Sequence, residues 1–372
     1  LARKLNVRRK DRHQPGDVMI QSFEGAVVAV TGAAGTVGKE LVRQLLNEPT
    51  AQVRALDNNE TGLFELEHEM NKPGQLAAFL CDISREEGLM RFLDGVDYVF
   101  HAAALKHVPL CENSPFEAVR VNVHGMENVI RASLAGGVKK VLFTSSDKAV
   151  NPTSVMGTTK LMGERLITAA QNLSSARRPT IFASTRFGNV VGSRGSVLPL
   201  FMQQIERGLP ITLTHNEMTR FMMTLEEASG LVIDSIRYAS GGENFITKMP
   251  VMRIRDVAEV MVDMMAPYYG RDPRDSEIKI IGMRPGEKLY EELSTAEELA
   301  RMWDCGRYFV VDPLNVDGER TYPSDNPQPT DRVYISSTEP AMSHEGIRSF
   351  IEAAQVLPED YEPAPTPRVA LG

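Results

Sequence analysis

The sequence predicts an α/β protein in which a doubly wound parallel sheet is followed by a smaller C-terminal α/β lobe. Short apolar runs alternate with amphipathic helical segments from Ala26 onward, and a glycine-rich turn joins the first run to the first helix. This alternation of predicted strands and helices changes after about Gly195. The chain has 372 residues, which is long enough for one large α/β domain and a smaller lobe.

The strands expected for the sheet are "AVVAVTG", "QVRALD", "LAAFLCDI", "DYVFHAAA", "KKVLFTS" and "PTIFASTRFGNVV". Helical segments lie between them, such as "FEAVRVNVHGMENVIRASLA" and "TVGKELVRQLLN", in which Val37, Leu41 and Leu45 recur at helical spacing. Strands that alternate with helices of ten or more residues form βαβ units, so the sheet should be parallel.

The later part of the chain predicts a different arrangement, with helices in "SVLPLFMQQIERG", "TLEEASGLVIDSIRYA" and "RIRDVAEVMVDMMAPYY" and a short strand in "PITLT". We expect residues 23–195 to form the main domain. Residues 196–312 should form mainly the smaller lobe, with one strand or more returning to the main sheet. Residues 1–22 form a basic arm, and residues 313–372 form an irregular extension because they begin with a segment rich in Pro, Asp and Asn.

The composition is that of an ordinary globular protein, with 42% hydrophobic and 24% charged residues. A net charge of −8 argues against a general nucleic-acid binder, so no nucleic-acid partner is expected. Cys81, Cys111 and Cys305 stand far apart, which suggests free thiols in a reducing compartment and therefore a cytoplasmic location.

The N-terminal arm "LARKLNVRRKDRH" is the one strongly basic segment. A solvated arm is the simpler interpretation. Because the chain starts at Leu1 rather than Met, the arm also fits a stem beside a membrane anchor, in which case the chain is the cytoplasmic domain of a longer protein. No apolar run in the sequence approaches the roughly 20 residues that span a bilayer.

Three glycines predict a dinucleotide site. Gly32, Gly35 and Gly38 follow the first strand with the spacing G-x-x-G-x-x-G and open the first helix, with Thr36 and Val37 between the last two. Residues without a Cβ allow the tight turn and let a pyrophosphate approach the amides at the helix N-terminus. Glycines between a strand and a helix can also serve packing, so these three alone do not predict a cofactor site. The prediction of a Rossmann-like, NAD-binding domain depends on the motifs that follow them in order.

Asp57 ends the second strand, where a carboxylate accepts hydrogen bonds from the adenosine ribose hydroxyls. A carboxylate there repels a 2′-phosphate, so the sequence favours NAD, while Arg54 nearby leaves NADP as the alternative. The other residues expected to contact the cofactor lie at strand ends or on the helix that follows. They are Asp82, Ile83, Ala102, Ala103, Ala104 and Asn122.

Seven segments together resemble the UDP-N-acetylglucosamine 4,6-dehydratases. They are "TGAAGTVG", "HAAALKHVP", "NVHGMENVI", "SSDKAVNPTSVMGTTK", "RFGNVVGSRGSVLPLF", "MTRFMMTLEEA" and "MRPGEKLYEEL". These enzymes belong to the extended short-chain dehydrogenase/reductase superfamily and serve bacterial polysaccharide and glycan biosynthesis. The resemblance runs from about Gly25 to Leu293 and more weakly to about Phe350. Related nucleotide-sugar enzymes usually carry Ser or Thr followed by Tyr-x-x-x-Lys, and Ser146 and Lys160 match the hydroxyl residue and the lysine. Met156 occupies the tyrosine position here, which marks one branch of the family.

The resemblance implies a redox-neutral reaction. The sugar C4 hydroxyl is oxidised by hydride transfer to NAD⁺, water leaves across C5 and C6, and the hydride returns to C6. By the same resemblance, Asp147 is the general acid for the C6 hydroxyl and Lys148 is the base at C5. Burial should raise the pKa of Asp147 and lower the pKa of Lys148. The competing interpretation is a solvated Asp-Lys turn.

The remaining catalytic assignments also follow from the resemblance. Lys160 should bind the nicotinamide ribose, and Ser146 should bind the C4 oxygen. Without the tyrosine, the C4 proton leaves through Ser146 with Asp147 or Lys148, and the sequence does not decide between them. Met156 should pack against the sugar or the nicotinamide.

Several positions are expected to hold the substrate, with the arginines on the diphosphate and a carboxylate on the uridine ribose. A surface lysine and structural ion pairs are the competing interpretations. No grouping of histidines suggests a metal, so no metal is expected. The expected substrate-binding residues are Lys106, Asn189, Ser196, Val197, Arg220, Arg284 and Glu287.

The function expected from the sequence is dehydration of UDP-N-acetylglucosamine to a UDP-4-keto-6-deoxy-hexosamine. The alternatives are the same dehydration with inversion at C5, another UDP-sugar epimerase, or a non-catalytic NAD-binding scaffold. The resemblance also implies a homo-oligomer, a dimer or larger, that pairs through the helices in "FEAVRVNVHGMENVIRAS" and "GTTKLMGERLITAAQNL".

Overall fold

The computed structural model describes residues 22–174, 179–192, 197–283, 286–314, 320 and 322–361. Two predicted substrate-binding residues, Ser196 and Arg284, lie outside the described residues, as does nearly all of the predicted N-terminal arm.

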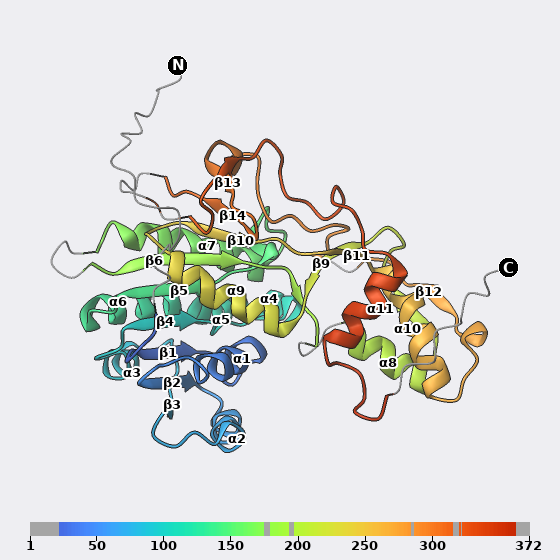
Figure 1. Cartoon of the computed structure of the whole chain (residues 1–372), viewed down its shortest axis with the longest axis horizontal. Helices are drawn as coiled ribbons and strands as arrows, with labels where there is room; N and C mark the ends of the chain where they lie inside the picture. The colour runs from blue at the N-terminus through green and yellow to red at the C-terminus, as the bar shows by residue number, and fades with distance from the viewer. Residues whose placement is uncertain are drawn as a thin grey trace.

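A ten-stranded sheet forms the centre of the described chain, in the order β15-β13-β14-β10-β6-β5-β4-β1-β2-β3 (Figure 1). The strands from β10 to β3 run parallel to their neighbours, which confirms the predicted doubly wound, Rossmann-like sheet. They are β1 (Val27–Thr31), β2 (Gln52–Asp57), β3 (Leu76–Leu80), β4 (Tyr98–His101), β5 (Lys140–Thr144), β6 (Ile181–Arg186) and β10 (Asn244–Thr247).

Helices cover both faces of this sheet because its strands send apolar side chains alternately to the two sides. Val28 and Val30 of β1 belong to one core, and Ala29 between them belongs to the other. The first core lies under α1 (Thr36–Leu45), α2 (Glu60–Met70) and α9 (Leu225–Tyr238). The second lies under α3 (Glu86–Phe92), α6 (Gly125–Gly136) and α7 (Val155–Gln171).

The later part of the chain returns to the main sheet beyond β6. β10 continues the parallel order, and three antiparallel strands extend the edge: β14 (Tyr308–Val311), β13 (Met302–Asp304) and β15 (Gln328–Pro329). The edge strands therefore come from the part of the sequence that also builds the lobe.

The C-terminal lobe has its own hydrophobic core and lies at one end of the molecule (Figure 1). Its elements are α8 (Val197–Arg207), β8 (Ile211–Leu213), α10 (Ile254–Tyr268), β12 (Ile278–Ile280) and α11 (His344–Ala353). A separate three-stranded sheet joins β7 (Asn189–Val190), β9 (Thr219–Met223) and β11 (Val251–Arg253).

Helix α11 differs from the predicted irregular extension. Ser343 caps it by accepting a hydrogen bond from the Gly346 N–H at 3.2 Å, and Ile347 and Ile351 are buried in the lobe. The two buried residues are one helical turn apart, so this amphipathic pattern forms a helix once the lobe supplies a partner.

Among the described residues, no helix combines the length and the apolar character that a membrane crossing requires.

Candidate functional site

The turn between β1 and α1 presents a backbone surface without Cβ atoms. Gly32 has φ +70°, and a Cβ there would lie 2.6 Å from the backbone nitrogen of Ala103. A Cβ on Gly38 would lie 2.0 Å from the Gly32 carbonyl oxygen. Gly35, the N-cap of α1, has no side chain, so it offers no capping oxygen to the N–H groups that begin at Thr36. Uncapped amides at a helix N-terminus fit the pyrophosphate of a dinucleotide.

Asp57 is held beside this turn at the end of β2. Its Oδ2 accepts from the Ala34 N–H and its Oδ1 accepts from the Asn59 N–H, both at 2.9 Å. Arg54, considered above as a partner for a 2′-phosphate, instead donates to the carbonyl oxygen of Phe92 at 2.8 Å. The geometry therefore fits a free ribose hydroxyl better than a phosphate, and NAD better than NADP.

The turn after β3 carries the two residues predicted to contact adenine. The Asp82 Oδ1 accepts from the backbone N–H and the hydroxyl of Ser84, at 2.9 and 2.7 Å. The Asn128 side chain donates to the carbonyl oxygen of Ile83 at 3.0 Å. These bonds fix the turn at the edge of the sheet where Asp57 also lies.

Asn122 positions the loop that follows β4 and carries Ala102, Ala103, Ala104 and Lys106. It lies in the π-helical turn η1 (Arg120–His124) between α5 (Pro115–Val119) and α6, a kind of turn that is frequent at functional sites. Its amide nitrogen donates to the Leu105 carbonyl at 3.0 Å and to the Thr159 hydroxyl at 2.9 Å, and its oxygen accepts from the Leu105 N–H at 2.8 Å. Asn122 is buried, and these bonds hold the loop in place, while its contact with the cofactor stays a prediction.

Ser146, Asp147 and Lys148 form one connected group at the carboxyl end of β5. The Ser146 hydroxyl donates to the Asp147 Oδ1 at 2.6 Å, and the Lys148 Nζ lies 3.1 and 3.0 Å from the two Asp147 oxygens. The Asp147 N–H donates to the carbonyl oxygen of Phe187, which ties the turn to the segment after β6. The Asp147 side chain is 4% exposed and that of Lys148 is 38% exposed, so the carboxylate is buried and the lysine side chain is only partly covered.

The charges in this group differ from our prediction. Burial opposes the charge on Asp147, but Lys148, the Ser146 hydroxyl and Arg220 outweigh it and lower the pKa of Asp147. Burial also opposes the charge on Lys148, but Asp147 and Glu291 outweigh it and raise the pKa of Lys148. The predicted directions are therefore wrong for this state of the protein, because each group stabilises the charge of the other.

Lys160 is buried on α7 behind this turn. Its Nζ donates to the Thr144 carbonyl oxygen at 2.9 Å and lies 4.7 Å from the centre of the Phe143 ring. Burial lowers the pKa of Lys160 to about 8, although Glu164 opposes the shift. The neighbouring His101 is kept neutral, because burial and the charge of Lys160 lower its pKa to about 3. Lys160 is thus fixed between β5 and α7.

Met156 packs into a small apolar cluster instead of opening toward the site. Its side chain is 3% exposed and shares this cluster with Cys111 and Ala118. The contact with the sugar or nicotinamide therefore stays a prediction.

The predicted substrate-binding residues divide into two groups. Asn189 and Arg220 lie near the catalytic turn, and Glu287 lies 3.9 Å from Arg220 and accepts from the Thr214 hydroxyl at 3.2 Å. Lys106 is exposed on the loop after β4, and Val197 opens α8 and packs against the core of the lobe.

Glu291 is a site residue that the sequence interpretation missed. Its oxygens accept from the Asn189 amide nitrogen at 2.8 and 2.9 Å and from the Phe221 N–H at 3.0 Å, and one lies 3.3 Å from the Arg220 Nε. Burial, reinforced by the charge of Asp147, raises the pKa of Glu291 to about 7. The only signal in the sequence was its place in "EKLYEEL", directly after the motif that carries Glu287.

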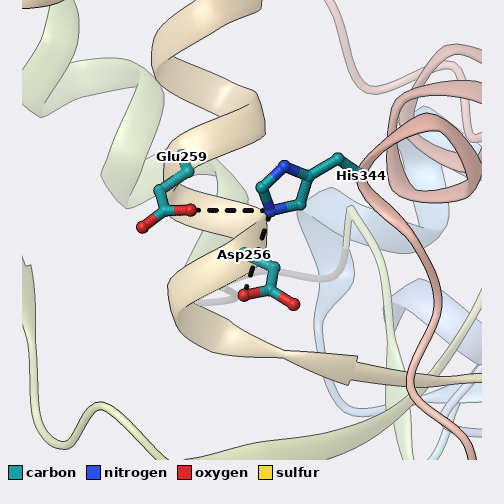
Figure 2. A group of neighbouring side chains, drawn as sticks. All are labelled: Asp256, Glu259 and His344. Carbon is teal, nitrogen blue, oxygen red and sulfur yellow. Dashed lines mark ion pairs between the residues drawn. The ribbon is translucent and has the colours of Figure 1, made fainter.

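Asp256, Glu259 and His344 are the three residues of a second cluster, between α10 and α11 (Figure 2). The His344 Nε2 lies 3.5 Å from Glu259 and 3.9 Å from Asp256. Arg255 donates to Glu259 at 2.9 Å, and Arg253 lies 3.9 Å from Asp256. Each carboxylate thus already faces an arginine. We therefore interpret the cluster as ion pairs that hold α11 on α10. The expected absence of a metal stays a prediction.

Comparison with known proteins places this site in a family. The family described as "Polysaccharide biosynthesis protein" matches residues 28–313. A protein of Methanocaldococcus jannaschii, named as an uncharacterized membrane protein, is 51% identical over 298 residues, which cover 80% of this chain and 89% of the relative. The inverting UDP-N-acetylglucosamine 4,6-dehydratase of Campylobacter jejuni is 38% identical over 295 residues, or 78% of this chain and 84% of the relative. The UDP-glucose 4-epimerase of Rickettsia bellii is 36% identical over 293 residues, or 78% of this chain and 83% of the relative.

Solved structures share the fold over most of the chain. The crystal structure of Pen from Bacillus thuringiensis matches with a TM-score of 0.81 and 40% identity, covering 91% of this chain and all of that one (100%). The Thermus thermophilus UDP-glucose 4-epimerase, solved with NAD, shares the fold at a TM-score of 0.60 and 22% identity, covering 88% of this chain and 98% of that one.

Proposed function

The chain belongs to the polysaccharide biosynthesis protein family, matched over residues 28–313, and from this premise we propose that it is an NAD-dependent UDP-N-acetylglucosamine 4,6-dehydratase. The observation that carries the proposal is the connected Ser146–Asp147–Lys148 group at the end of β5, beside the glycine turn and Lys160. A relative named for this activity is 38% identical over 78% of the chain.

NAD is the cofactor in this proposal, and its nicotinamide supplies the chemistry of taking a hydride from C4 of the sugar and returning it to C6. Gly32, Gly35 and Gly38 would leave room for its pyrophosphate, and Asp57 would accept from the hydroxyls of the adenosine ribose. Lys160 would orient the second ribose from α7.

The protein moves the protons. The C4 hydroxyl gives its proton to the Ser146 hydroxyl, which passes its own proton to Asp147 along the 2.6 Å hydrogen bond. Asp147, now protonated, donates this proton to the C6 hydroxyl, which leaves as water. Neutral Lys148 takes the C5 proton during this step and returns a proton to C5 when C6 is reduced, so the protons balance over one turnover.

Lys148 must therefore give up one proton before it can act as a base. This proton passes to solvent before the sugar covers the site, because Asp147 has to remain a carboxylate to receive the C4 proton. A bound sugar covers the exposed side of Lys148 and removes water from it, and this desolvation disfavours the ammonium form. The ion pair between Lys148 and Asp147 is then the state of the enzyme before substrate binds.

Two other activities compete with this proposal. Rickettsial relatives are named UDP-glucose 4-epimerases, but a simple epimerase has no use for the Asp147–Lys148 pair and relies on the tyrosine that Met156 replaces. Inversion at C5, which the Campylobacter jejuni relative is named for, differs only in the face from which C5 receives its proton.

We expect purified protein to convert UDP-N-acetylglucosamine in D₂O to a 4-keto-6-deoxy product with deuterium at C5. NMR identifies the product, and the configuration at C5 distinguishes retention from inversion. Formation of the C4 epimer alone would instead assign the chain to the epimerases, and binding of NAD without any product would support a scaffold.

We also propose a homo-oligomer. Large apolar side chains are exposed on α4 (Val108–Asn113), α5 and α7: Leu110 is 65%, Phe116 87% and Met162 46% exposed. An apolar surface of this kind is typical of an interface between copies. Sedimentation equilibrium should give at least twice the monomer mass of 41.2 kDa, and Phe116→Asp should shift the protein toward the monomer. A wild-type protein that sediments as a monomer would contradict the proposal.

A further inference from the structure

Glu291 stands out because its buried carboxylate joins two residues predicted to bind substrate. The side chain is 4% exposed. One oxygen accepts from Asn189 at 2.8 Å and lies 3.3 Å from the Arg220 Nε, and the other accepts from Asn189 at 2.9 Å and from the Phe221 N–H at 3.0 Å. Both residues are thereby fixed by the same carboxylate.

The other donors of Arg220 are also bound by the protein. Its Nη1 donates to the Thr219 carbonyl oxygen at 2.8 Å, and its Nη2 donates to the Lys288 carbonyl oxygen at 2.8 Å. The guanidinium is therefore locked in one orientation by Glu291 and by the backbone. A side chain that is held in this way offers a fixed positive charge and loses little conformational freedom when a ligand binds.

The backbone around Glu291 is equally constrained. Its N–H donates to the Ser336 hydroxyl at 2.9 Å, and Ser336 also contacts the Thr219 hydroxyl at 2.8 Å. Lys288, three residues earlier, donates to the Val150 carbonyl oxygen at 2.9 Å, next to the catalytic turn. Glu291 therefore lies on a segment that is anchored both to β9 and to the turn of Asp147.

The charged groups that act on Glu291 come from two elements. Asp147 and Lys148 lie on the turn after β5, and Arg220 lies on β9. Glu291 in turn favours the charged form of Lys148, in the same direction as Asp147 does. Glu291 thus acts on the proposed base without being its hydrogen-bond partner among the described contacts.

We propose that Glu291 is a positioning residue of the active site, which fixes Asn189 and Arg220 for the sugar nucleotide and acts on Lys148 through its charge. The effect on Lys148, and therefore on kcat and the pH profile, rests on the proposed function. The effect on substrate binding through Asn189 and Arg220 does not. A carboxylate that holds two binding residues should contribute to substrate affinity even if the reaction is not a dehydration.

The test compares Glu291→Gln with Glu291→Asp and with the matched control Glu243→Gln. Glu243 is also a buried carboxylate, which accepts from the Gly241 N–H at 2.6 Å and lies 3.5 Å from Arg320, but it precedes β10 at the opposite end of the sheet. Three quantities are measured: Kd for UDP by calorimetry, KM and kcat for UDP-N-acetylglucosamine, and the pH profile of kcat/KM. Thermal melting shows whether each variant is folded.

Above pH 7, where Glu291 with its pKa of about 7 is mainly ionised, Glu291→Gln should raise both Kd and KM by at least about 10-fold, because it weakens hydrogen bonds to a charged acceptor. The limb of the pH profile that reports the deprotonation of Lys148 should move to lower pH, because a negative charge that stabilises its ammonium form is removed. Glu291→Asp should recover part of the affinity, and Glu243→Gln should resemble the wild type.

The outcomes separate the two proposals. A folded Glu291→Gln variant with wild-type Kd, KM and pH profile overturns the role of Glu291. A wild-type protein that binds UDP but does not dehydrate the sugar overturns the proposed function, while the change in Kd still tests Glu291. A wild-type protein that binds neither UDP nor the sugar nucleotide overturns both.

Discussion

Lys148→Ala is expected to reduce the turnover of UDP-N-acetylglucosamine by about 10²- to 10⁴-fold, the range that a positioned general base contributes. The variant keeps the Ser146–Asp147 hydrogen bond and the glycine turn, so NAD should remain bound. Since only the C5 step loses its base, kcat should fall much more than the affinity for UDP. Steady-state kinetics, NAD content and UDP binding measured on the same preparation provide the test.

Lys248→Ala is a matched control for this variant. Lys248 also pairs with an aspartate, Asp304, at 2.6 Å, and its side chain is 29% exposed, but this pair lies at the β10–β13 edge of the sheet. The control should retain wild-type turnover. If Lys148→Ala instead keeps full activity, Lys148 is not the base at C5, and the proton route through the Asp147–Lys148 pair has to be abandoned.

The structure has the glycine turn and Asp57 where the sequence predicted them, because the physical requirements of this turn are local, while their contacts with the cofactor stay predictions. Gly32 and Gly38 are needed where a strand turns tightly into a helix, and Asp57 stands at the end of the next strand. In a parallel sheet the carboxyl ends of neighbouring strands meet at one edge, so the spacing along the chain is enough to bring these residues together.

The rest of the site depends on contacts between distant segments, which spacing does not encode. In the sequence, Glu291 is one of several acidic residues in a polar segment. It becomes a buried hydrogen-bond acceptor only because the fold brings Asn189 and Arg220 next to it. The pKa directions of Asp147 and Lys148 were wrong for the same reason. Burial is predictable from the position after a strand, but the partner that outweighs it is a matter of side-chain geometry.

Helix α11 shows the same limit for the fold. Its sequence follows a segment rich in Pro, Asp and Asn, which predicted an irregular extension. The helix is stabilised by the burial of Ile347 and Ile351 in the lobe core, and its first residue, His344, pairs with α10 (Figure 2). Tertiary packing therefore stabilises a helix in a segment whose local composition predicted an irregular structure.

A buried ion triad behind the catalytic turn gives the second large prediction. Arg186, at the end of β6, lies 2.6 Å from Glu164 of α7 and 2.8 Å from Glu298 of η4 (Glu298–Arg301). The three side chains are 3%, 6% and 8% exposed. Burial opposes the charge on Arg186, but the two carboxylates outweigh it, so the pKa of Arg186 stays above its ordinary value. Ser145, next to Ser146 of the proposed catalytic group, donates to Glu164 at 2.5 Å, so the triad also supports the turn.

Arg186→Met is expected to lower the free energy of unfolding by about 3–5 kcal/mol, because it leaves two buried carboxylates without their cation. The transition midpoint in urea, followed by circular dichroism, measures the effect. Arg274→Met is the control, since Arg274 pairs with Asp272 and has a side chain that is 89% exposed, and it should leave the free energy of unfolding close to the wild-type value.

The triple variant Arg186→Met, Glu164→Gln and Glu298→Gln separates charge from packing. If unpaired charge causes the loss, removing both carboxylates as well should recover much of the stability of the single variant, because neutral amides are far less costly to bury. If the loss comes from the hydrogen bonds that hold β6, α7 and η4 together, the triple variant should be at least as unstable as Arg186→Met. The second outcome would make the triad a geometric support for Lys160 and Ser145, and the stability lost would then be accompanied by weaker NAD binding in any triple variant that still folds.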